Sequence, residues 1–448
     1  MIASYPRHPR KSAAKSSSGR AAVLVDLGYS LKFMADLNIN FAGIKSPNPF
    51  WLASAPPTNM GPMIERAFDA GWGGAVWKTL GEPITNVSSR LASLDQGALR
   101  MIGLNNIELI TDRPLEVNLK EVYECKKKYP KHAVIVSLMV ESKREAWQEI
   151  VKKSQDTGCD GFELNFGCPH GMSERGMGAA MGQVPEYTCM VTEWVKEVSN
   201  LPVIVKLTPN VTHIVPPGHA AQKGGADAVS LINTINSVMG VDIDTMIPYP
   251  NVNGMAAHGG YCGTAVKPIA LNMVSELARD PEFNIPISGI GGINNWRDAV
   301  EFLLLGAGNV QVCTAVMHYG YRIVEDMIDG LNNYLDEKGF ASVNHIIGKS
   351  VERVTDWGNL DLNYDVKAQV NNEHCIRCNL CYIACEDGAH QSFRFHEVDG
   401  KRYPYVLDEE CVGCNLCALV CPSPGAITMK RVDAGGPSES WRDRTSGK

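Results

Sequence analysis

A structural unit that recurs between residues 50 and 320 constrains this chain more than any other feature. Each copy contains a helix-like stretch, a glycine-containing turn, and a short apolar strand that ends in a polar residue. Examples are "FDAGWGGAVWK", "QDTGCDGFELN", "QKGGADAVSLINT" and "LLGAGNVQVCT". Glycine suits a left-handed helix cap, and a strand that is apolar on both faces suits a parallel sheet covered by helices. The segments "FWLASA", "HAVIVSLM", "PVIVKLTP" and "PISGIGG" bring the strands to eight.

Eight strands that alternate with helices predict an α/β fold of the (β/α)8 TIM-barrel type. A doubly wound open sheet is the competing fold. It calls for a G-x-G-x-x-G turn after the first strand, and "FWLASAPPTNM" contains none. The chain has 448 residues, of which 44% are hydrophobic, so it is long enough for a barrel and a second, smaller domain. We expect the barrel to occupy residues 34–333.

Two cysteine runs predict the second domain. They read "CIRCNLCYIAC" at 375–385 and "CVGCNLCALVC" at 411–421, and each has the spacing C-x2-C-x2-C-x3-C. In two-cluster ferredoxins with this spacing, three cysteines of a run hold one 4Fe-4S cluster and the fourth crosses to the other. Zinc is the competing metal, but zinc sites use separate C-x2-C pairs and would leave cysteines of each run without a role. The predicted ligand sets are Cys375, Cys378, Cys381 and Cys421 for one cluster, and Cys411, Cys414, Cys417 and Cys385 for the other.

These runs place a 2[4Fe-4S] ferredoxin-like domain at 372–431, after a linker over 334–371. We expect the tail, 432–448, to be disordered. Residues 1–33 form a basic extension, also expected to be disordered, that resembles an organellar transit peptide or a basic arm. Equally, folded-looking sequence begins at Met34, so the upstream residues fit an extension before the start site.

Composition narrows the class of protein further. The net charge of −7 argues against a nucleic-acid partner, which needs a basic face. The chain has no apolar stretch of the length that a bilayer span needs, so we expect no membrane association. Its fourteen cysteines, without a recognisable secretory signal, favour metal binding over disulfides and predict a cytoplasmic protein.

In a barrel of this type, chemistry lies at the carboxyl ends of the strands. Those ends carry lysines, amides and small residues here, and they lack the paired carboxylates of a glycosidase. The glycines at 291–292 and the small residues at 313–314 suit a phosphate-binding corner, and Lys206 suits the N1–O2 edge of a flavin. Taken singly, the glycines fit simple turns and the lysine fits a rim charge. Together with clusters that pass single electrons, they predict flavin mononucleotide (FMN).

Cys168 lies in a loop that directly follows Asn165 and a predicted strand. A thiol with an ordinary pKa is protonated at neutral pH and can act as a general acid. The flanking Pro169 and His170 predict an exposed loop, and the glycine-rich run "GMSERGMGAAMGQ" predicts a mobile lid. The structural alternative is a cysteine buried by packing. That is our interpretation of three others, namely Cys125, Cys159 and Cys189.

The segments "ELNFGCPHGM", "LTPNVT", "INT", "GTAVKPIAL" and "GIGG", with the cysteine runs, resemble dihydropyrimidine dehydrogenases from about Leu37 to about Lys430. The resemblance implies reversible reduction of uracil or thymine, with hydride transfer from FMN and Cys168 as the catalytic general acid. It implies substrate contacts at Asn106, Asn165, Asn233 and Thr234. It implies FMN contacts at Ser54, Lys78, Thr79, Lys206, Gly263, Gly291, Gly292, Cys313 and Thr314.

The resemblance also implies a partner subunit that carries FAD, the NAD site and further iron-sulfur clusters, in a hetero-oligomer for which a heterotetramer is one arrangement. The chain itself shows no dinucleotide fingerprint, because "GIGGIN" lacks the third glycine. Two residues depart from the family pattern: Gly167 and Cys262 stand where serines are common. The alternatives are a dihydroorotate dehydrogenase-type flavoenzyme, which must bind a carboxylate, and a non-catalytic electron-transfer module.

Overall fold

The computed structural model of this protein describes residues 35–432 and 436–446. The predicted extension over 1–33 therefore lies outside the described residues. Eight parallel strands form a closed barrel, and they are the eight that the recurring unit predicts. In chain order they are β3 (Phe50–Leu52), β4 (Gly74–Leu80), β7 (Ala133–Leu138), β8 (Gly161–Asn165), β9 (Val203–Lys206), β10 (Ala228–Leu231), β15 (Ile287–Ile290) and β16 (Ala307–Val312).

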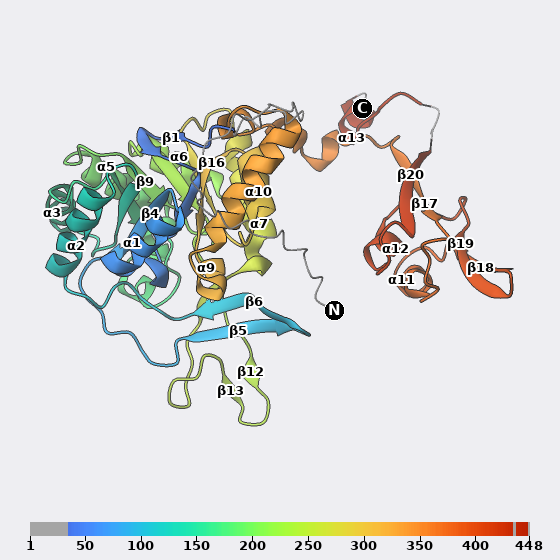
Figure 1. The fold of residues 1–448 in the computed structure, drawn as a ribbon, viewed down its shortest axis with the longest axis horizontal. Coiled ribbons are helices and arrows are strands. Elements are labelled where there is room, and N and C mark those ends of the chain that lie inside the picture. Colours follow the sequence, from blue (N-terminus) through green and yellow to red (C-terminus); the bar gives the residue numbers. More distant parts are fainter. Residues whose placement is uncertain (1–34, 433–435, 447–448) are drawn as a thin grey trace, which may run out of the picture.

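A helix follows each barrel strand and covers the barrel from outside (Figure 1). Shorter helical turns lie in the loops at the strand ends. Within the described residues, none of the helices combines the length and apolar character that crossing a bilayer would require. The covering helices are α1 (Gly61–Ala70), α2 (Leu115–Lys128), α3 (Arg144–Gln155), α5 (Pro185–Lys196), α6 (Val215–Lys223), α7 (Lys267–Arg279), α8 (Trp296–Leu304) and α10 (Ile323–Lys338).

The main apolar core lies between the barrel strands and these helices. Every residue of β4 is buried, as expected for a strand with the barrel interior on one side and helices on the other. The indole N–H of Trp51 donates to the Ser46 hydroxyl at 3.0 Å, and that of Trp77 donates to the Asn118 carbonyl oxygen at 3.1 Å. These two buried tryptophans therefore add packing area while their N–H groups stay hydrogen-bonded.

An accessory antiparallel sheet lies at one end of the barrel, below it in Figure 1. Its strand order is β11-β14-β6-β5, and the small pair β12–β13 extends beyond it. Residues of this sheet line the same cavity as the carboxyl ends of the barrel strands, so it forms the roof of that end. Its strands are β5 (Leu91–Gln96), β6 (Leu99–Asn106), β11 (Ile235–Ser237) and β14 (Gly259–Cys262), and the pair is β12 (Val241–Asp242) and β13 (Ile247–Pro248).

The small domain stands apart from the barrel, on the right in Figure 1. It has two antiparallel strand pairs and two helices that each begin within a cysteine run. One pair is β17 (Asp365–Val370) with β20 (Ile427–Val432), and the other is β18 (Phe393–Val398) with β19 (Lys401–Val406). The helices are α11 (Leu380–Gly388) and α12 (Leu416–Leu419).

The predicted linker over 334–371 is too long at both ends. Helix α10 continues to Lys338, and β17 already belongs to the small domain, where it pairs with β20 along its whole length. The connection is therefore 339–364, and it contains three short 3-10 turns. β17 escaped prediction because its pairing partner lies about 60 residues further along the chain, beyond the reach of local pattern.

The expectation of a disordered tail is wrong for 436–446. This segment ends in the helix α13 (Trp441–Ser446). The Asp356 carboxylate joins two arginines, at 3.1 Å from Arg279 on α7 and 3.3 Å from Arg442 on α13. The Asn363 amide also donates to the Pro437 carbonyl at 2.7 Å. Polar contacts with residues 339–364 hold this segment in place. Its sequence has almost no apolar periodicity, so a sequence pattern does not reveal these contacts.

Candidate functional site

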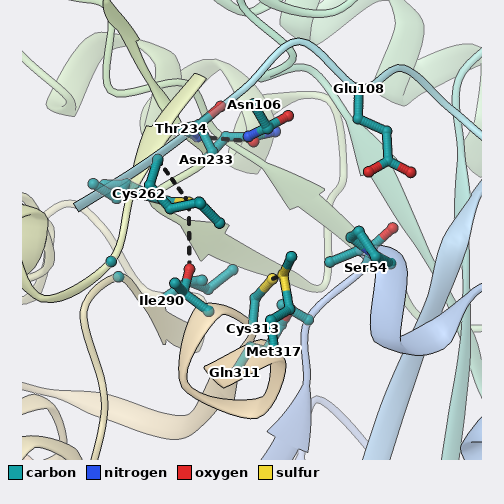
Figure 2. A pocket seen from close by; sticks show the side chains of 18 of the residues that line it. Ser54, Asn106, Glu108, Asn233, Thr234, Cys262, Ile290, Gln311, Cys313 and Met317 are labelled. Atoms are coloured by element: carbon teal, nitrogen blue, oxygen red, sulfur yellow. Dashed lines mark hydrogen bonds between the residues drawn. The ribbon is translucent and has the colours of Figure 1, made fainter. Parts of the chain in front are cut away.

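A cavity of about 1140 Å³ opens at the carboxyl end of the barrel, between the strand ends and the accessory sheet (Figure 2). Its lining includes all the residues for which the sequence predicts a catalytic, substrate or flavin role. They come from seven of the eight barrel strands or the loops after them, and from the accessory sheet. The structure thus brings the whole predicted set together around one space, and the role of each residue stays a prediction.

Hydrogen bonds join the strand ends into a polar row. The hydroxyl oxygens of Ser54 and Thr79 lie 3.2 Å apart, and the Asn165 amide donates to Thr79 Oγ1 at 3.0 Å. Asn233 Nδ2 donates in turn to Asn165 Oδ1 at 2.9 Å. Asn106, on the roof, donates to the Gly260 carbonyl at 3.0 Å, and it is labelled with Asn233 in Figure 2. Each amide therefore has a fixed orientation and keeps an N–H donor for a ligand.

Gly167 is required by this packing. A Cβ atom at that position would lie 2.3 Å from the Asn233 Cβ and 2.4 Å from its Nδ2, far inside any real contact. The serine that is common in the resembling family would therefore push the Asn233 side chain away from Asn165. The departure at Gly167 is thus coupled to the orientation of a predicted substrate contact.

The loop that carries Cys168 is buried, which corrects the expectation of an exposed loop. Cys168 is 9% exposed and His170 is 4% exposed. Cys168 packs in a small apolar cluster with Met172 and Met177, from the segment that the sequence predicts to be a lid, and with Met139. A proline next to a histidine predicts exposure, but Met172 and Met177, further along the loop, pack against the thiol.

Burial raises the pKa of the Cys168 thiol to about 11, partly offset by its contact with the His170 backbone. The thiol is therefore neutral at neutral pH and holds a proton that it can give away. Burial also lowers the pKa of the neighbouring His170 ring, which is accordingly neutral. Its Nε2 lies 3.1 Å from the Glu108 carbonyl oxygen, so we assign the ring proton to Nε2.

Glu108 is a site residue that the sequence analysis does not single out. Its carboxylate pairs with the Lys78 ammonium and lies 3.6 Å from Arg90 Nε. The side chain is 9% exposed and lines the cavity. It lies two residues after Asn106, just past the end of β6, and both side chains line the cavity. That spacing is the signal that could have found it.

Glu163 is the second such residue. It is fully buried on β8, and its Oε1 lies 3.4 Å from the Lys206 Nζ. Both lysines of the cavity lining therefore have a carboxylate partner. Glu163 precedes Asn165 by two residues in the strand, and this spacing places both side chains on one face.

The predicted phosphate corner has a backbone that suits it. Gly263, Gly291 and Gly292 have φ angles of 95°, 131° and 73°, which side chains rarely adopt. A Cβ at Gly292 would lie 2.7 Å from the Lys267 Cβ. These glycines let the backbone approach an anionic group closely.

The two other cysteines of the cavity lining are neutral. Cys262 accepts a hydrogen bond from the Thr314 hydroxyl at 3.3 Å, so the residue that replaces a common serine has a polar partner. Burial raises the pKa of Cys262 to about 11 and that of Cys313 to about 12. Elsewhere in the barrel, Cys125 and Cys159 are buried packing residues as expected, whereas Cys189 is partly exposed on α5.

The eight cysteines of the small domain surround two separate cavities. One cavity of about 340 Å³ is lined by the four cysteines of the first predicted ligand set, and the other, of about 330 Å³, by the four of the second. Each cavity thus receives three cysteines from one run and the last cysteine from the other run. Within the described residues, no group of three or more His, Cys, Asp or Glu side chains is placed to hold one metal ion. Four thiols spaced around a cavity suit the corners of a 4Fe-4S cube better than one zinc ion.

Comparison with known proteins agrees with this division. Residues 36–335 match the family model described as dihydroorotate dehydrogenase, and residues 368–429 match a 4Fe-4S dicluster domain. The NAD-dependent dihydropyrimidine dehydrogenase subunit PreA of Escherichia coli K12 is 43% identical over 364 residues, which cover 81% of this chain and 88% of that protein.

Two further relatives each match about seven tenths of this chain. The chloroplastic dihydropyrimidine dehydrogenase (NADP(+)) of Arabidopsis thaliana is 42% identical over 71% of this chain and 78% of its own length. The catalytic subunit of dihydroorotate dehydrogenase B (NAD(+)) of Pyrococcus abyssi is 39% identical over 70% of this chain and 99% of its own length.

Proposed function

This chain belongs to the dihydroorotate dehydrogenase family of flavin-binding barrels, with a 4Fe-4S dicluster domain after the barrel, and we propose that it is the catalytic subunit of an NAD-dependent dihydropyrimidine dehydrogenase. The reaction is the reversible reduction of uracil or thymine to the 5,6-dihydropyrimidine. The observation that carries the proposal is a buried, protonated thiol, Cys168, in the same cavity as a row of oriented amides.

The amides match a pyrimidine ring. Donors and acceptors alternate around uracil, and an amide can donate and accept at once. A hydrogen bond of 2.9 Å joins Asn165 and Asn233. Asn106, in the roof, and Thr234, the residue after Asn233, line the same cavity. We assign these four residues to binding and orienting the ring, which gives the reaction the geometry that it needs.

Cys168 supplies the proton. The hydride for C6 of the ring would come from FMN bound in this cavity. The neutral Cys168 thiol then protonates C5, and in the reverse direction the thiolate takes the proton back. The apolar cluster around the loop excludes water from this proton transfer.

FMN fits the remaining lining. The glycines at 263, 291 and 292 suit its phosphate, and Lys206 suits the edge of the ring that gains negative charge on reduction. Gln311 Oε1 is buried in the same lining without a hydrogen-bond partner, as expected of an acceptor kept for a ligand. Ser54, Lys78, Thr79, Cys313 and Thr314 complete the proposed contacts.

The clusters connect this site to an electron donor. The two cysteine sets would hold 4Fe-4S clusters that pass electrons one at a time to the flavin. We propose that NAD and FAD bind to a separate iron-sulfur subunit in a cytoplasmic hetero-oligomer. The E. coli relative is itself named as a subunit.

A dihydroorotate dehydrogenase activity would need a free cation for the substrate carboxylate. Both lysines of the cavity lining are paired, Lys78 with Glu108 and Lys206 with Glu163. The Glu108 carboxylate would also repel a second carboxylate in the cavity. The charges of this site therefore favour an uncharged pyrimidine over orotate.

A single-turnover experiment tests the proposal. The anaerobically purified chain is photoreduced and mixed with uracil, thymine or orotate, and flavin reoxidation is followed together with product. We expect dihydrouracil or dihydrothymine and no dihydroorotate. Turnover of orotate alone would assign the site to the other enzyme class, and no turnover by flavin-loaded protein would leave an electron-transfer module.

A further inference from the structure

A charged group lies inside the barrel directly below the cavity. Glu163 is fully buried on β8, two residues before Asn165, and both side chains point to the barrel interior because strand side chains alternate. Asn165 lines the cavity, whereas Glu163 does not. Its carboxylate therefore occupies the layer below the cavity floor.

The two oxygens of this carboxylate have different partners. Oε2 accepts hydrogen bonds from Ser230 Oγ at 2.8 Å and from Gln311 Nε2 at 3.0 Å. The same Gln311 nitrogen also lies 3.1 Å from Ser288 Oγ, so three neighbouring strands hold one side of the carboxylate. Oε1 has no hydrogen bond and faces the Lys206 ammonium at 3.4 Å.

Lys206 completes the arrangement. It ends β9, is 5% exposed and lines the cavity. Within the described part of the chain, its ammonium makes no hydrogen bond, and its one ion pair is with Glu163. The ammonium therefore has a carboxylate below it and open cavity above it, with N–H donors available on that side.

Burying a carboxylate costs free energy unless a partner compensates its charge. Removing an ion from water costs several kcal/mol even after relaxation, roughly as much for each member of a pair. A barrel interior does not need a charge at this depth, because a neutral glutamine has nearly the same volume and could use the same hydroxyl partners. The charge itself is thus what distinguishes Glu163 from its neutral equivalent.

We propose that Glu163 is a positioning residue that holds the Lys206 ammonium at the cavity floor and offsets its positive charge, so that it limits how strongly the site stabilises negative charge on the bound flavin. The inference rests on flavin binding in this cavity, as in the proposed function. The proposed effect is on the stability of reduced flavin relative to oxidised flavin, and not on substrate binding.

Sulfite binding to the flavin-loaded protein measures this effect. Sulfite adds through its sulfur to N5 of oxidised flavin and places negative charge on the N1–O2 edge, and the flavin colour is lost. The clusters take no part in this equilibrium. For Glu163→Gln we expect sulfite to bind at least about tenfold more tightly, because the positive charge of Lys206 would no longer be offset by the buried carboxylate beside it.

Ser230→Ala is the matched control, because it removes a hydrogen bond to the same carboxylate and leaves the charge in place. We expect its sulfite affinity to stay within about twofold of the unmodified chain. If Ser230→Ala and Glu163→Gln tightened binding equally, Glu163 would act by packing alone and the proposal would be overturned. Unchanged affinity in a flavin-loaded Glu163→Gln protein would also overturn it.

A double-mutant cycle tests whether Glu163 acts through Lys206. If Glu163 acts by holding the ammonium in place, Glu163→Gln should change sulfite affinity by a clearly smaller factor in a Lys206→Gln background. An equal effect in both backgrounds would contradict the positioning role.

If Glu163→Gln lost its flavin, Glu163→Asp would serve instead, since it keeps the charge on a shorter side chain and should tighten sulfite binding by a smaller factor. A chain that binds no flavin at all would refute the proposed function, whereas these outcomes concern Glu163 alone.

Discussion

The barrel and the small domain are built on different kinds of core. The barrel core consists of apolar side chains from every strand and covering helix, and the predicted cofactor contacts lie at its end. The small domain has a core of six buried residues, of which four are the cysteines Cys381, Cys385, Cys411 and Cys417. Its core is therefore made largely of predicted cluster ligands.

The two cores indicate different sources of stability for the barrel and the small domain. A domain of this small size rarely buries enough apolar surface to fold on that basis alone, and metals commonly supply the rest. The barrel needs no such help. We therefore expect loss of the clusters to unfold the small domain, and loss of flavin to leave the barrel folded.

The largest expected effect follows from replacing a buried ligand. Cys417→Ser should abolish cluster binding at one site and NADH-driven turnover with the partner subunit, because the small domain loses both its core and its electron path. Iron content and limited proteolysis measure this outcome. Cys189→Ser, a partly exposed position in the barrel, is the control. If the Cys417→Ser small domain stayed protease-resistant, the contrast between the two cores would not hold.

Next in size is the proton step in the barrel. Cys168→Ala should lower turnover by about 10²- to 10⁴-fold, the usual contribution of a general acid. Flavin and iron content should be unchanged, since the apolar cluster around the loop can close over an alanine. Single-turnover kinetics of the photoreduced variant give the rate of this step. Normal turnover would assign Cys168 to packing.

Gly167→Ala tests the packing of the polar row. The added Cβ would meet Asn233 at 2.3 Å, so the amide must move and its bond to Asn165 is lost. We expect kcat/KM to fall by roughly 10- to 100-fold, which corresponds to the free energy of one or two lost hydrogen bonds. Gly240→Ala is the control, because the nearest atom there lies 4.0 Å away. Equal kcat/KM values for the two variants would contradict the assignment of Asn233 to substrate binding.

The pH dependence separates the two directions of the reaction. Burial raises the pKa of Cys168 to about 11, so the protonated thiol that ring reduction needs is present throughout the neutral range. Reduction should therefore not vary with pH between about 6 and 9, whereas the thiolate-dependent oxidation of dihydrouracil should rise toward high pH. Rates measured in both directions on one preparation test this. A fall in the reduction rate near neutral pH would indicate another acid.

The smallest expected effect concerns barrel stability alone. Asn295 caps α8, where its side chain accepts from the Arg297 and Asp298 backbone N–H groups. Asn295→Ala should lower the free energy of barrel unfolding by about 1 kcal/mol, with iron content unaffected. Asn272→Ala, at an exposed position within α7, is the control for thermal unfolding. A change in small-domain unfolding would show that the two regions are coupled.

Much of this architecture could be predicted from the sequence. The eight strands repeat one pattern, and parallel strands in a closed barrel bring their carboxyl ends to one place, so residues such as Ser54, Asn165 and Lys206 had to meet. The cysteine spacing likewise predicts two crossed sets of four, and the structure gathers those sets around two cavities. In both cases a local pattern suffices, because repeated geometry does the rest.

Tertiary structure alone decided what surrounds those residues. The carboxylates of Glu108 and Glu163 pair with lysines on other strands, and Glu163 also accepts from Gln311, 148 positions away. The burial of the Cys168 loop, the pairing of β17 and the ordering of α13 also depend on distant segments. Burial and charge pairing are properties of the space around a side chain, and residues remote in the chain fill that space, so no local pattern encodes them.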